Sequence, residues 1–279
     1  MTSGKQFKEY FEKKVRNTIR KYNLFTKKDR IAVAVSGGKD STSCLYILSK
    51  LGYNIEAITI DHGIGDYARI NINNLTNFCK AHKIKLHAYS FREEFGKSLP
   101  AIRKILKSKG HDYSYCMLCG ILKRYLLNKH AREYDFVATG HNLDDEAQAF
   151  LMNVFRNDFR LAARQGPMPG TSNSGRFVQR VKPLYLLSEA ETKRYSKIMK
   201  FPVNYNSCPY SSDAFRRDFR KILDETEKKN PSVKYNIIRF QETMTENMVM
   251  KKVNINICER CGEPASKKIC NTCRIISWI

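Results

Sequence analysis

The chain has 279 residues, of which 42% are hydrophobic, and a formal net charge of +23. This length and composition suit one large domain with small appendages and exclude wholesale disorder, while the lack of a long apolar run or a signal-peptide core excludes a membrane span and secretion. We therefore expect a soluble cytoplasmic protein, and its excess of lysine and arginine favours a polyanionic partner.

The N-terminal residues 1–28 predict a basic amphipathic helix ahead of the main domain. Within residues 1–30, ten lysines and arginines stand against three acids. Apolar residues recur there at helical spacing; they are Phe7, Phe11, Val15 and Ile19.

Residues 29–209 alternate between apolar strands and helices, which predicts an α/β domain with a doubly wound parallel sheet. We predict strands over 31–35, 54–60, 84–90, 136–139 and 178–182. Helices are predicted over 40–50, 70–82, 120–132, 144–156 and 189–199, and segment 165–176 has the composition of a loop. Residues 210–254 are polar and predicted to be helical, and residues 255–279 form a separate cysteine-bearing tail.

A glycine-rich segment lies between the first predicted strand and its helix; it reads Ser36-Gly37-Gly38-Lys39-Asp40-Ser41. Glycines let the backbone approach an anion, and the N–H groups of a helix N-terminus bind phosphate. The segment matches neither the Walker A pattern nor the dinucleotide fingerprint. It resembles the PP-loop of the adenine nucleotide α-hydrolase-like enzymes, which cleave ATP between the α and β phosphates and adenylate a carbonyl oxygen. The resemblance implies that Lys39 neutralises phosphate charge, that Ser36 and Ser41 donate hydrogen bonds, and that Asp40 helps to hold Mg²⁺.

Two further polar segments end strands at the same predicted edge of the sheet. Gly140-His141-Asn142-Leu143-Asp144-Asp145-Glu146 follows the fourth strand, and Asp61-His62-Gly63 ends the second. Ligands bind at the carboxyl edge of open parallel sheets, so these segments are predicted to border the nucleotide, with contacts from Gly140, His141, Asp61 and His62. The carboxylates of Asp144 and Asp145 suit Mg²⁺ or acid–base work, or they only cap a helix.

Nine cysteines in a reducing compartment indicate metal or sulfur chemistry rather than disulfides. Cys116 and Cys119 form a CxxC pair at a predicted helix start, where thiolates have lowered pKa values and bind metal readily. With the remote Cys208 they make three ligands, one short of a closed site; a redox pair and buried free thiols are the alternatives. Cys44 and Cys79 stand alone in predicted helices and are interpreted as core residues.

The tail carries two CxxC pairs separated by eight residues, namely Cys258, Cys261, Cys270 and Cys273. This is the spacing of a closed tetrahedral Zn²⁺ site of the zinc-ribbon type. A second Fe–S cluster is the main competing interpretation. A four-thiolate zinc site has no open position, so its predicted role is to fold and position the tail.

Together, SGGKDS, the CxxC pair with Lys123 one turn later, GHNLDDEAQ and a late Cys-Pro resemble the TtcA/TtuA group of tRNA thiolases. The similarity covers roughly residues 30–275 and is greatest to the branch of TtuA and the archaeal–eukaryotic 2-thiouridine synthetases. It implies ATP at the PP-loop, a [4Fe-4S] cluster on Cys116, Cys119 and Cys208, and conversion of a tRNA uridine into 2-thiouridine. ATP would adenylate the uridine O2, and sulfide on the open iron, or a persulfide, would attack C2.

The same resemblance gives Asp145 or Asp144 the role of holding Mg²⁺ or assisting proton transfer, and Lys123 that of offsetting charge near the cluster. tRNA is the expected partner, and the sulfur donor is sulfide or a ubiquitin-like sulfur carrier. A homodimer is compatible with the sequence, and no membrane partner is expected.

Two basic runs are predicted to track RNA phosphates around the catalytic edge. They comprise Lys97, Arg103, Lys104, Lys107 and Lys109, then Arg156, Arg160, Arg164, Arg176, Arg180 and Lys182. The alternative enzymes are a tRNA 2-thiocytidine synthetase and a lysidine-synthetase-like or amidotransferase-type PP-loop enzyme, of which the latter two need no cysteine triad. A non-catalytic zinc-ribbon RNA-binding scaffold is the non-enzymatic alternative, and it leaves SGGKDS unexplained.

Overall fold

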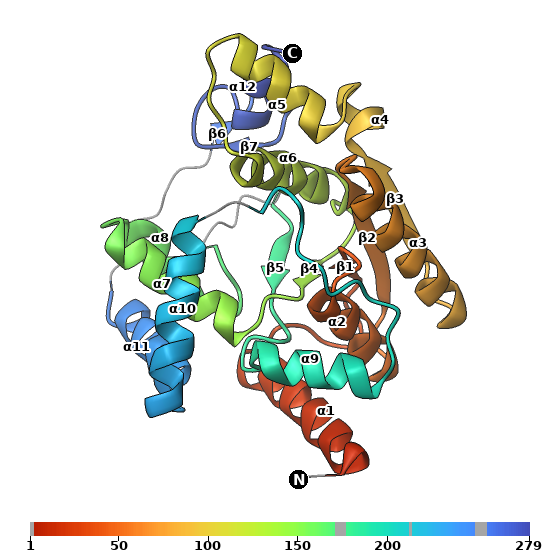
Figure 1. Cartoon of the computed structure of the whole chain (residues 1–279), viewed down its shortest axis with the longest axis vertical. Coiled ribbons are helices and arrows are strands. Elements are labelled where there is room, and N and C mark those ends of the chain that lie inside the picture. Colours follow the sequence, from red (N-terminus) through yellow and green to blue (C-terminus); the bar gives the residue numbers. More distant parts are fainter. Residues whose placement is uncertain (1–2, 171–176, 212–213, 249–255) are drawn as a thin grey trace.

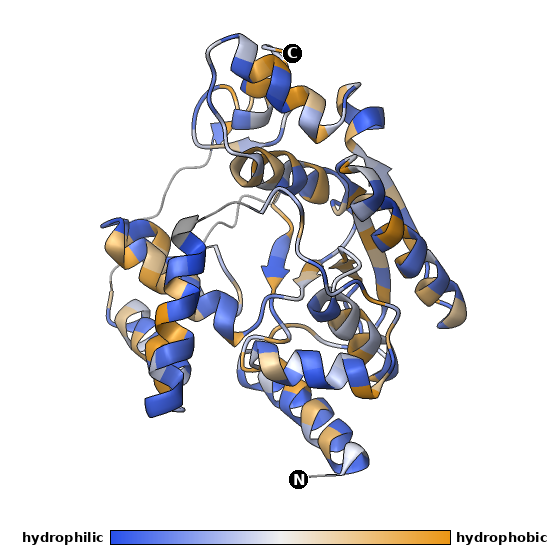
Figure 2. Ribbon diagram, viewed as in Figure 1, coloured by the Kyte–Doolittle hydropathy of each residue, from blue (hydrophilic) through white to orange (hydrophobic). Residues whose placement is uncertain are grey.

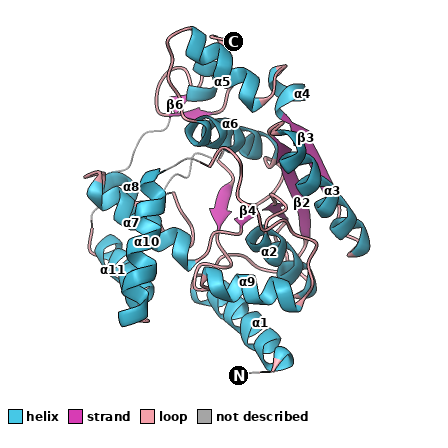
Figure 3. Cartoon of the chain, viewed as in Figure 1, coloured by secondary structure: helices cyan, strands magenta, loops and turns pink. Residues whose placement is uncertain are grey.

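A five-stranded parallel sheet with strand order β3-β2-β1-β4-β5 forms the centre of the computed structural model, which describes residues 3–170, 177–211, 214–248 and 256–279. Its strands are β1 (Ile31–Ala34), β2 (Ile55–Asp61), β3 (Leu86–Ser90), β4 (Phe136–Thr139) and β5 (Gln179–Val181). Helices separate consecutive strands and lie on both faces of the sheet (Figure 3). This confirms the doubly wound α/β fold predicted from the alternating pattern.

Side chains of β1 alternate between two hydrophobic clusters, one on each face of the sheet. Ile31 and Val33 belong to one cluster and Ala32 to the other, as the two-residue period of a strand requires. The first face is covered by α1 (Gly4–Lys21), α2 (Lys39–Lys50), α3 (Gly65–Ala81) and α9 (Glu189–Ile198). The second is covered by α4 (Phe91–Phe95), α5 (Leu99–Ser108) and α6 (Tyr115–His130).

The N-terminal helix α1 packs through the four apolar residues predicted from its spacing, and all four are buried in the first cluster. Phe11 stacks on Tyr195 of α9 with ring centroids 3.9 Å apart. Beside this contact, Lys14 forms a salt bridge of 2.8 Å with Glu191. The helix therefore shares the core of the sheet domain.

Four helices form a separate layer beside the strand edge at β5 (Figure 1). They are α7 (Leu143–Phe155), α8 (Phe159–Ala163), α10 (Ala214–Lys229) and α11 (Val233–Glu246). The predicted single helical stretch is thus two helices, because Pro231 lies between them and lacks the N–H that a helix interior needs. Residues 212–213 and 249–254 of that stretch lie outside the described residues.

The cysteine-bearing tail folds into a two-stranded ribbon and a short helix that dock on α6. Its elements are β6 (Asn256–Ile257), β7 (Pro264–Ala265) and α12 (Asn271–Ile276). Buried Glu263 accepts a hydrogen bond of 2.6 Å from Asn128 of α6 and is paired with Arg132. Ile275 of α12 is fully buried in the second core cluster, and Trp278 stacks on His111 at 3.8 Å.

Four of the described helices were not predicted, namely α4, α5, α8 and α12. In α5 the buried residues Leu99, Ile102 and Leu106 follow helical spacing, but this segment was interpreted only as a basic run that tracks RNA phosphates. None of the helices in the described part of the chain combines the length and the apolar character that a membrane span requires.

Candidate active site

The PP-loop turns from β1 into α2 with two glycines that have different tasks. Gly37 has φ +76°, and a Cβ there would lie 2.8 Å from the carbonyl oxygen of Asn71 in α3. Gly38 is the N-cap of α2 and provides no side-chain cap. The first N–H groups of α2 are therefore free of a capping side chain, as an anion-binding helix N-terminus requires.

Ser36 and Ser41 fix the shape of this loop. The Ser36 N–H donates to Ser41 Oγ at 3.1 Å, and the two hydroxyl oxygens are 3.3 Å apart. Ser41 Oγ also donates to the Gly38 carbonyl at 3.2 Å. These hydrogen bonds hold the two predicted serines against each other within the turn.

The second motif contacts the PP-loop directly. A Cβ on Gly140 would lie 2.7 Å from the backbone nitrogen of Ser41, so only a glycine fits between β4 and α2. Asn142 caps α7 and also donates to Asp40 Oδ1 at 3.2 Å. His141 lies at the same edge, where its Nδ1 is 2.8 Å from Thr139 Oγ1. The topology thus brings segments about a hundred residues apart in sequence to one edge.

Carboxylates surround Lys39 at the start of α2. Its Nζ donates to Asp40 at 2.8 Å and to Glu189 at 2.9 Å. Burial opposes the charge on Lys39, but these two carboxylates outweigh it and raise the lysine pKa. Glu189 is the second acid of this cluster, and sequence reasoning missed it because its only local signal is a place in the first turn of α9.

Asp145 completes this acidic cluster, whereas Asp144 lies apart from it. Burial raises the pKa of Asp145, and the negative charges of Asp40 and Glu189 raise the pKa further. The ion pair of 2.7 Å with Arg216 acts in the opposite direction. Asp144 is buried; one oxygen accepts from Lys234 at 2.5 Å and the other from the Glu189 N–H at 2.7 Å. Both oxygens of Asp144 are thus engaged by other parts of the protein, which does not favour its predicted role of holding Mg²⁺ or assisting proton transfer.

A cavity of ≈ 230 Å³ opens at the carboxyl edge between the PP-loop and α6. Its walls include Ala34, Val35, Ser36, Gly38, Asp40, Ser41, Ile58, Ile60, Lys123, Leu127, Thr139, Gly140 and His141. The apolar walls come from β1, β2 and α6 and the polar ones from the two glycine motifs. The cavity thus combines apolar walls with an anion-binding helix end.

Asp61 and His62 lie beside this cavity without forming its walls. Asp61 accepts a hydrogen bond of 2.7 Å from the Gly63 N–H and so closes the turn after β2. Burial, reinforced by the charge of Lys123, lowers the pKa of His62 to about 4. The His62 ring is therefore neutral at pH 7.

Three cysteines gather at the N-terminus of α6, namely Cys116, Cys119 and Cys208. They belong neither to the tail nor to the two core positions. Cys116 is in the first turn, where its Sγ is 3.7 Å from the carbonyl oxygen of Tyr210, and Tyr210 stacks on Tyr115 at 4.1 Å. Burial raises the pKa of Cys119; Lys123 lowers it, and the charges of Cys208 and Cys116 raise it. The segment after α9 therefore returns to the CxxC turn, as the prediction required. None of the three is in a disulfide.

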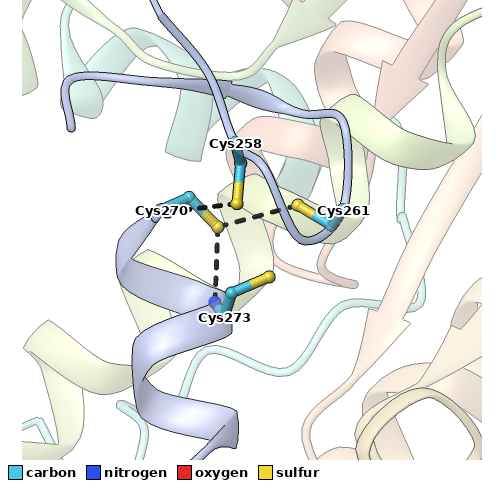
Figure 4. Close-up of side chains that lie close together, drawn as sticks. All are labelled: Cys258, Cys261, Cys270 and Cys273. Atoms are coloured by element: carbon cyan, nitrogen blue, oxygen red, sulfur yellow. Dashed lines mark hydrogen bonds between the residues drawn. The ribbon is translucent and has the colours of Figure 1, made fainter. Parts of the chain in front are cut away.

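The four cysteines of the tail point toward one another (Figure 4). Their sulfur atoms all lie within 4.8 Å of one another, which fits a single metal ion. Cys261 and Cys270 have sulfurs 3.8 Å apart, and the N–H groups of Cys270 and Cys273 donate to sulfur at 3.3 Å. Such N–H···S bonds stabilise thiolate ligands.

The predicted basic surface is only partly present. Lys182 is buried and paired with Glu146 at 2.8 Å, and Arg176 lies outside the described residues. Arg103 stacks over Tyr115 of the cysteine turn at 4.6 Å. With Lys104 and Lys107 of α5 it lines an open cavity beside that turn. This places basic side chains next to the three cysteines.

A PP-loop domain family matches residues 7–225 of the chain. The chain is 38% identical to a tRNA-5-methyluridine(54) 2-sulfurtransferase of Pyrococcus horikoshii, over 96% of this chain and 85% of the relative. It is 30% identical to cytoplasmic tRNA 2-thiolation protein 1 of Anopheles gambiae, over 96% and 80%. Among solved structures, the U34-tRNA thiolase NcsA from Methanococcus maripaludis with its [4Fe-4S] cluster superposes with a TM-score of 0.79 at 31% identity, covering 93% of this chain and 84% of that one.

Proposed function

Because the chain belongs to the PP-loop family of tRNA 2-thiolation sulfurtransferases, we propose that it uses ATP to replace the O2 of a tRNA uridine by sulfur. The observation that carries this proposal is the position of Lys123. Its side chain lines the cavity of the PP-loop, and its charge also acts on the thiol of Cys119. One turn of α6 therefore separates the nucleotide site from the cysteine triad.

The proposed reaction has two bond exchanges. The uridine O2 attacks the α phosphorus of ATP, pyrophosphate leaves, and the N3 proton is released. Hydrosulfide then forms a bond to C2, the C2–O2 bond breaks, AMP leaves, and the proton of the hydrosulfide restores N3–H. Oxygen leaves as part of AMP, so neither an oxidant nor a reductant is consumed.

Residues of the PP-loop support the first exchange. The uncapped N-terminus of α2 and Lys39 attract the phosphates, and the serines hold the loop in shape. Asp40, Asp145 and Glu189 offer carboxylate oxygens, the ligands that Mg²⁺ prefers, so these residues would hold it. Bound there, Mg²⁺ would neutralise charge on the phosphates.

The cysteine triad would hold the [4Fe-4S] cluster in the second exchange. None of Cys116, Cys119 and Cys208 is in a disulfide, and the charges of Cys116 and Cys208 both act on Cys119, which fits three ligands of one group. When bound, the cluster supplies an iron without a protein ligand, which can hold the sulfur nucleophile. Lys123 stabilises negative charge between this place and the nucleotide, while the neutral ring of His62 adds no competing cation.

We assign the four tail cysteines to a structural Zn²⁺, because four sulfurs within 4.8 Å match tetrahedral thiolate coordination. The ribbon that they fold is docked on α6 through Glu263. A metal that orders the ribbon therefore also fixes one side of the helix that bears the catalytic turn. Sulfide is the simplest sulfur donor for the reaction as written, and a ubiquitin-like carrier is the alternative source.

The test compares iron-loaded and iron-free protein under anaerobic conditions. Incubated with ATP, sulfide and tRNA, the iron-loaded protein should form 2-thiouridine, detected by nucleoside analysis. Lys123→Met should lower the rate at least about tenfold, since it removes charge stabilisation in a partly enclosed site. The matched variant Lys129→Met, on the same helix but paired with Glu94 at 2.7 Å, should leave the rate unchanged. Equal effects of the two variants would contradict the role of Lys123, and full thiolation by iron-free protein would favour a persulfide instead.

A further inference from the structure

A second cavity, of ≈ 300 Å³, lies between α6, β5 and the docked ribbon. Its walls include Arg124, Tyr125, Phe177, Arg180 and Glu263, together with polar side chains of the ribbon. Arg124 follows Lys123 in sequence, so the two side chains leave α6 about 100° apart. The two cavities therefore lie against neighbouring faces of one helix.

Two arginines face this cavity, and neither forms an ion pair with a carboxylate among the described residues. Arg180 comes from β5, whose ribbon is hydrophilic in Figure 2 although most of the sheet is apolar. Burial lowers the pKa of Arg180, and the charge of Arg124 lowers it further. Two like charges thus share one space, which an anion between them would stabilise.

The acid that lines the same cavity does not neutralise these arginines. Both oxygens of Glu263 are engaged, one by Asn128 at 2.6 Å and the other by Arg132. Glu263 therefore leaves the positive charge of Arg124 and Arg180 available to a ligand.

Gly120 gives the Arg124 guanidinium its place. A Cβ on Gly120 would lie 3.2 and 3.3 Å from the two terminal nitrogens of Arg124, so the side chain folds back over the glycine toward Cys119. A glycine inside a helix costs about 1 kcal/mol relative to alanine. Here it frees the space that a planar guanidinium occupies.

The remaining walls suit a nucleotide unit. Tyr125 and Phe177 are aromatic, and Phe177 is 41% exposed, so they offer a surface for base stacking. Ser266, Asn271 and Thr272 of the ribbon add hydroxyl and amide groups. Guanidinium groups are the preferred partners of phosphate because their planar donors match its oxygens.

We propose that Arg124 and Arg180 together bind one backbone phosphate of the tRNA substrate, flanking the uridine that enters the nucleotide cavity. The proposal rests on the proposed function, which supplies the RNA. It explains why the ribbon is docked beside the reacting centre, since the ribbon forms one wall of the phosphate site. The bound strand would then cross α6 from this cavity to the side of Lys123.

The test measures tRNA binding without ATP at a series of salt concentrations. The double variant Arg124→Gln/Arg180→Gln should bind tRNA about tenfold more weakly. The slope of log K against log[salt] is negative, and its magnitude should decrease by roughly 0.7–0.9, the value for one phosphate contact. The matched control is Arg16→Gln/Arg20→Gln, which removes the same charge from exposed arginines of α1, at the end of the molecule away from the ribbon (Figure 1). An unchanged slope, or an equal decrease in the control, would overturn the proposal.

Further readouts separate this site from ATP binding and from misfolding. The double variant should keep its zinc content and its affinity for ATP, and in turnover it should raise KM for tRNA with little change in kcat, because the contact is made throughout the reaction. A loss of ATP affinity would overturn the assignment to RNA. Should the double variant fail to fold, the single variant Arg124→Gln should weaken tRNA binding in the same direction, and unchanged binding by that variant would overturn the proposal. Wild-type protein that binds tRNA but forms no 2-thiouridine would contradict the proposed function alone, and wild-type protein without tRNA binding would overturn both.

Discussion

Gly140→Ala tests whether the two glycine motifs are in direct contact, as the structure requires. The added Cβ would lie 2.7 Å from the nitrogen and 2.8 Å from the Cα of Ser41, and 2.8 Å from the carbonyl carbon of Asp40. These are backbone atoms at the start of α2, so no side-chain rotation relieves the overlap. Overpacking of this kind costs about 1–3 kcal/mol, which for a chain of this size lowers Tm by roughly 2–12 °C. Any shift of Ser41 also opens its hydrogen bond to Ser36, so ATP affinity should decrease with stability.

The assay is thermal unfolding together with an ATP titration of wild type and variant. Gly4→Ala is the matched control, because the nearest atom to its Cβ is a side-chain carbon of Ile198 at 3.8 Å, an ordinary contact. It should stay within about 0.5 kcal/mol of wild type. Gly140 has no positive φ, so the comparison isolates lack of space from backbone strain. A Gly140→Ala variant that melts and binds ATP like wild type would refute the close approach.

Three further predictions concern single contacts. Lys234→Met should lower the free energy of unfolding by about 3–5 kcal/mol in chemical denaturation, because it leaves the buried Asp144 carboxylate without its cation. Asp144→Asn in that background should recover part of the loss. A loss below about 1 kcal/mol would contradict the ion pair. Because the pKa of His62 is about 4 in the fold and about 6.5 in an unfolded chain, the unfolded state binds more protons between these values, so stability should decrease as the pH falls from 6.5 to 4. In the His62→Gln variant, stability should depend less on pH between 4 and 6.5. A variant profile identical to that of wild type would show that the fold does not hold the His62 ring neutral. Metal analysis should find about one Zn per chain and none after Cys258→Ser/Cys270→Ser, and zinc retained by that variant would rule out the four-thiolate site.

The parts of the site that local sequence determines were predictable. A strand, two glycines and a helix start are contiguous in the PP-loop, and the carboxyl-edge rule then predicts that the segment after β4 joins it. The return of Cys208 to the CxxC turn follows from the same rule. Local periodicity also predicted the face on which α1 packs, since Phe7, Phe11 and Val15 are buried as their spacing required.

The parts that depend on packing between distant elements were not predictable. Asp144 and Asp145 are adjacent in the first turn of α7, and only the position of Lys234 on α11 decides which of them is engaged away from the cavity. Glu189 reaches Lys39 across 150 positions of sequence. Arg180 and Arg124 share a cavity because the ribbon docks on α6, which no spacing within either segment reveals.

The central claim is that nucleotide and sulfur chemistry share one centre across a single turn of α6. The most direct measurement counts pyrophosphate and 2-thiouridine in one anaerobic reaction of iron-loaded protein with ATP, sulfide and tRNA. Wild type, and the core variant Cys79→Ala, should release about one pyrophosphate for each 2-thiouridine, following the two bond exchanges. Cys119→Ser should keep tRNA-dependent pyrophosphate release, because Cys119 is not among the walls of the nucleotide cavity, and should form no 2-thiouridine. Thiolation by Cys119→Ser at the wild-type rate, or 2-thiouridine formed without pyrophosphate, would contradict the account.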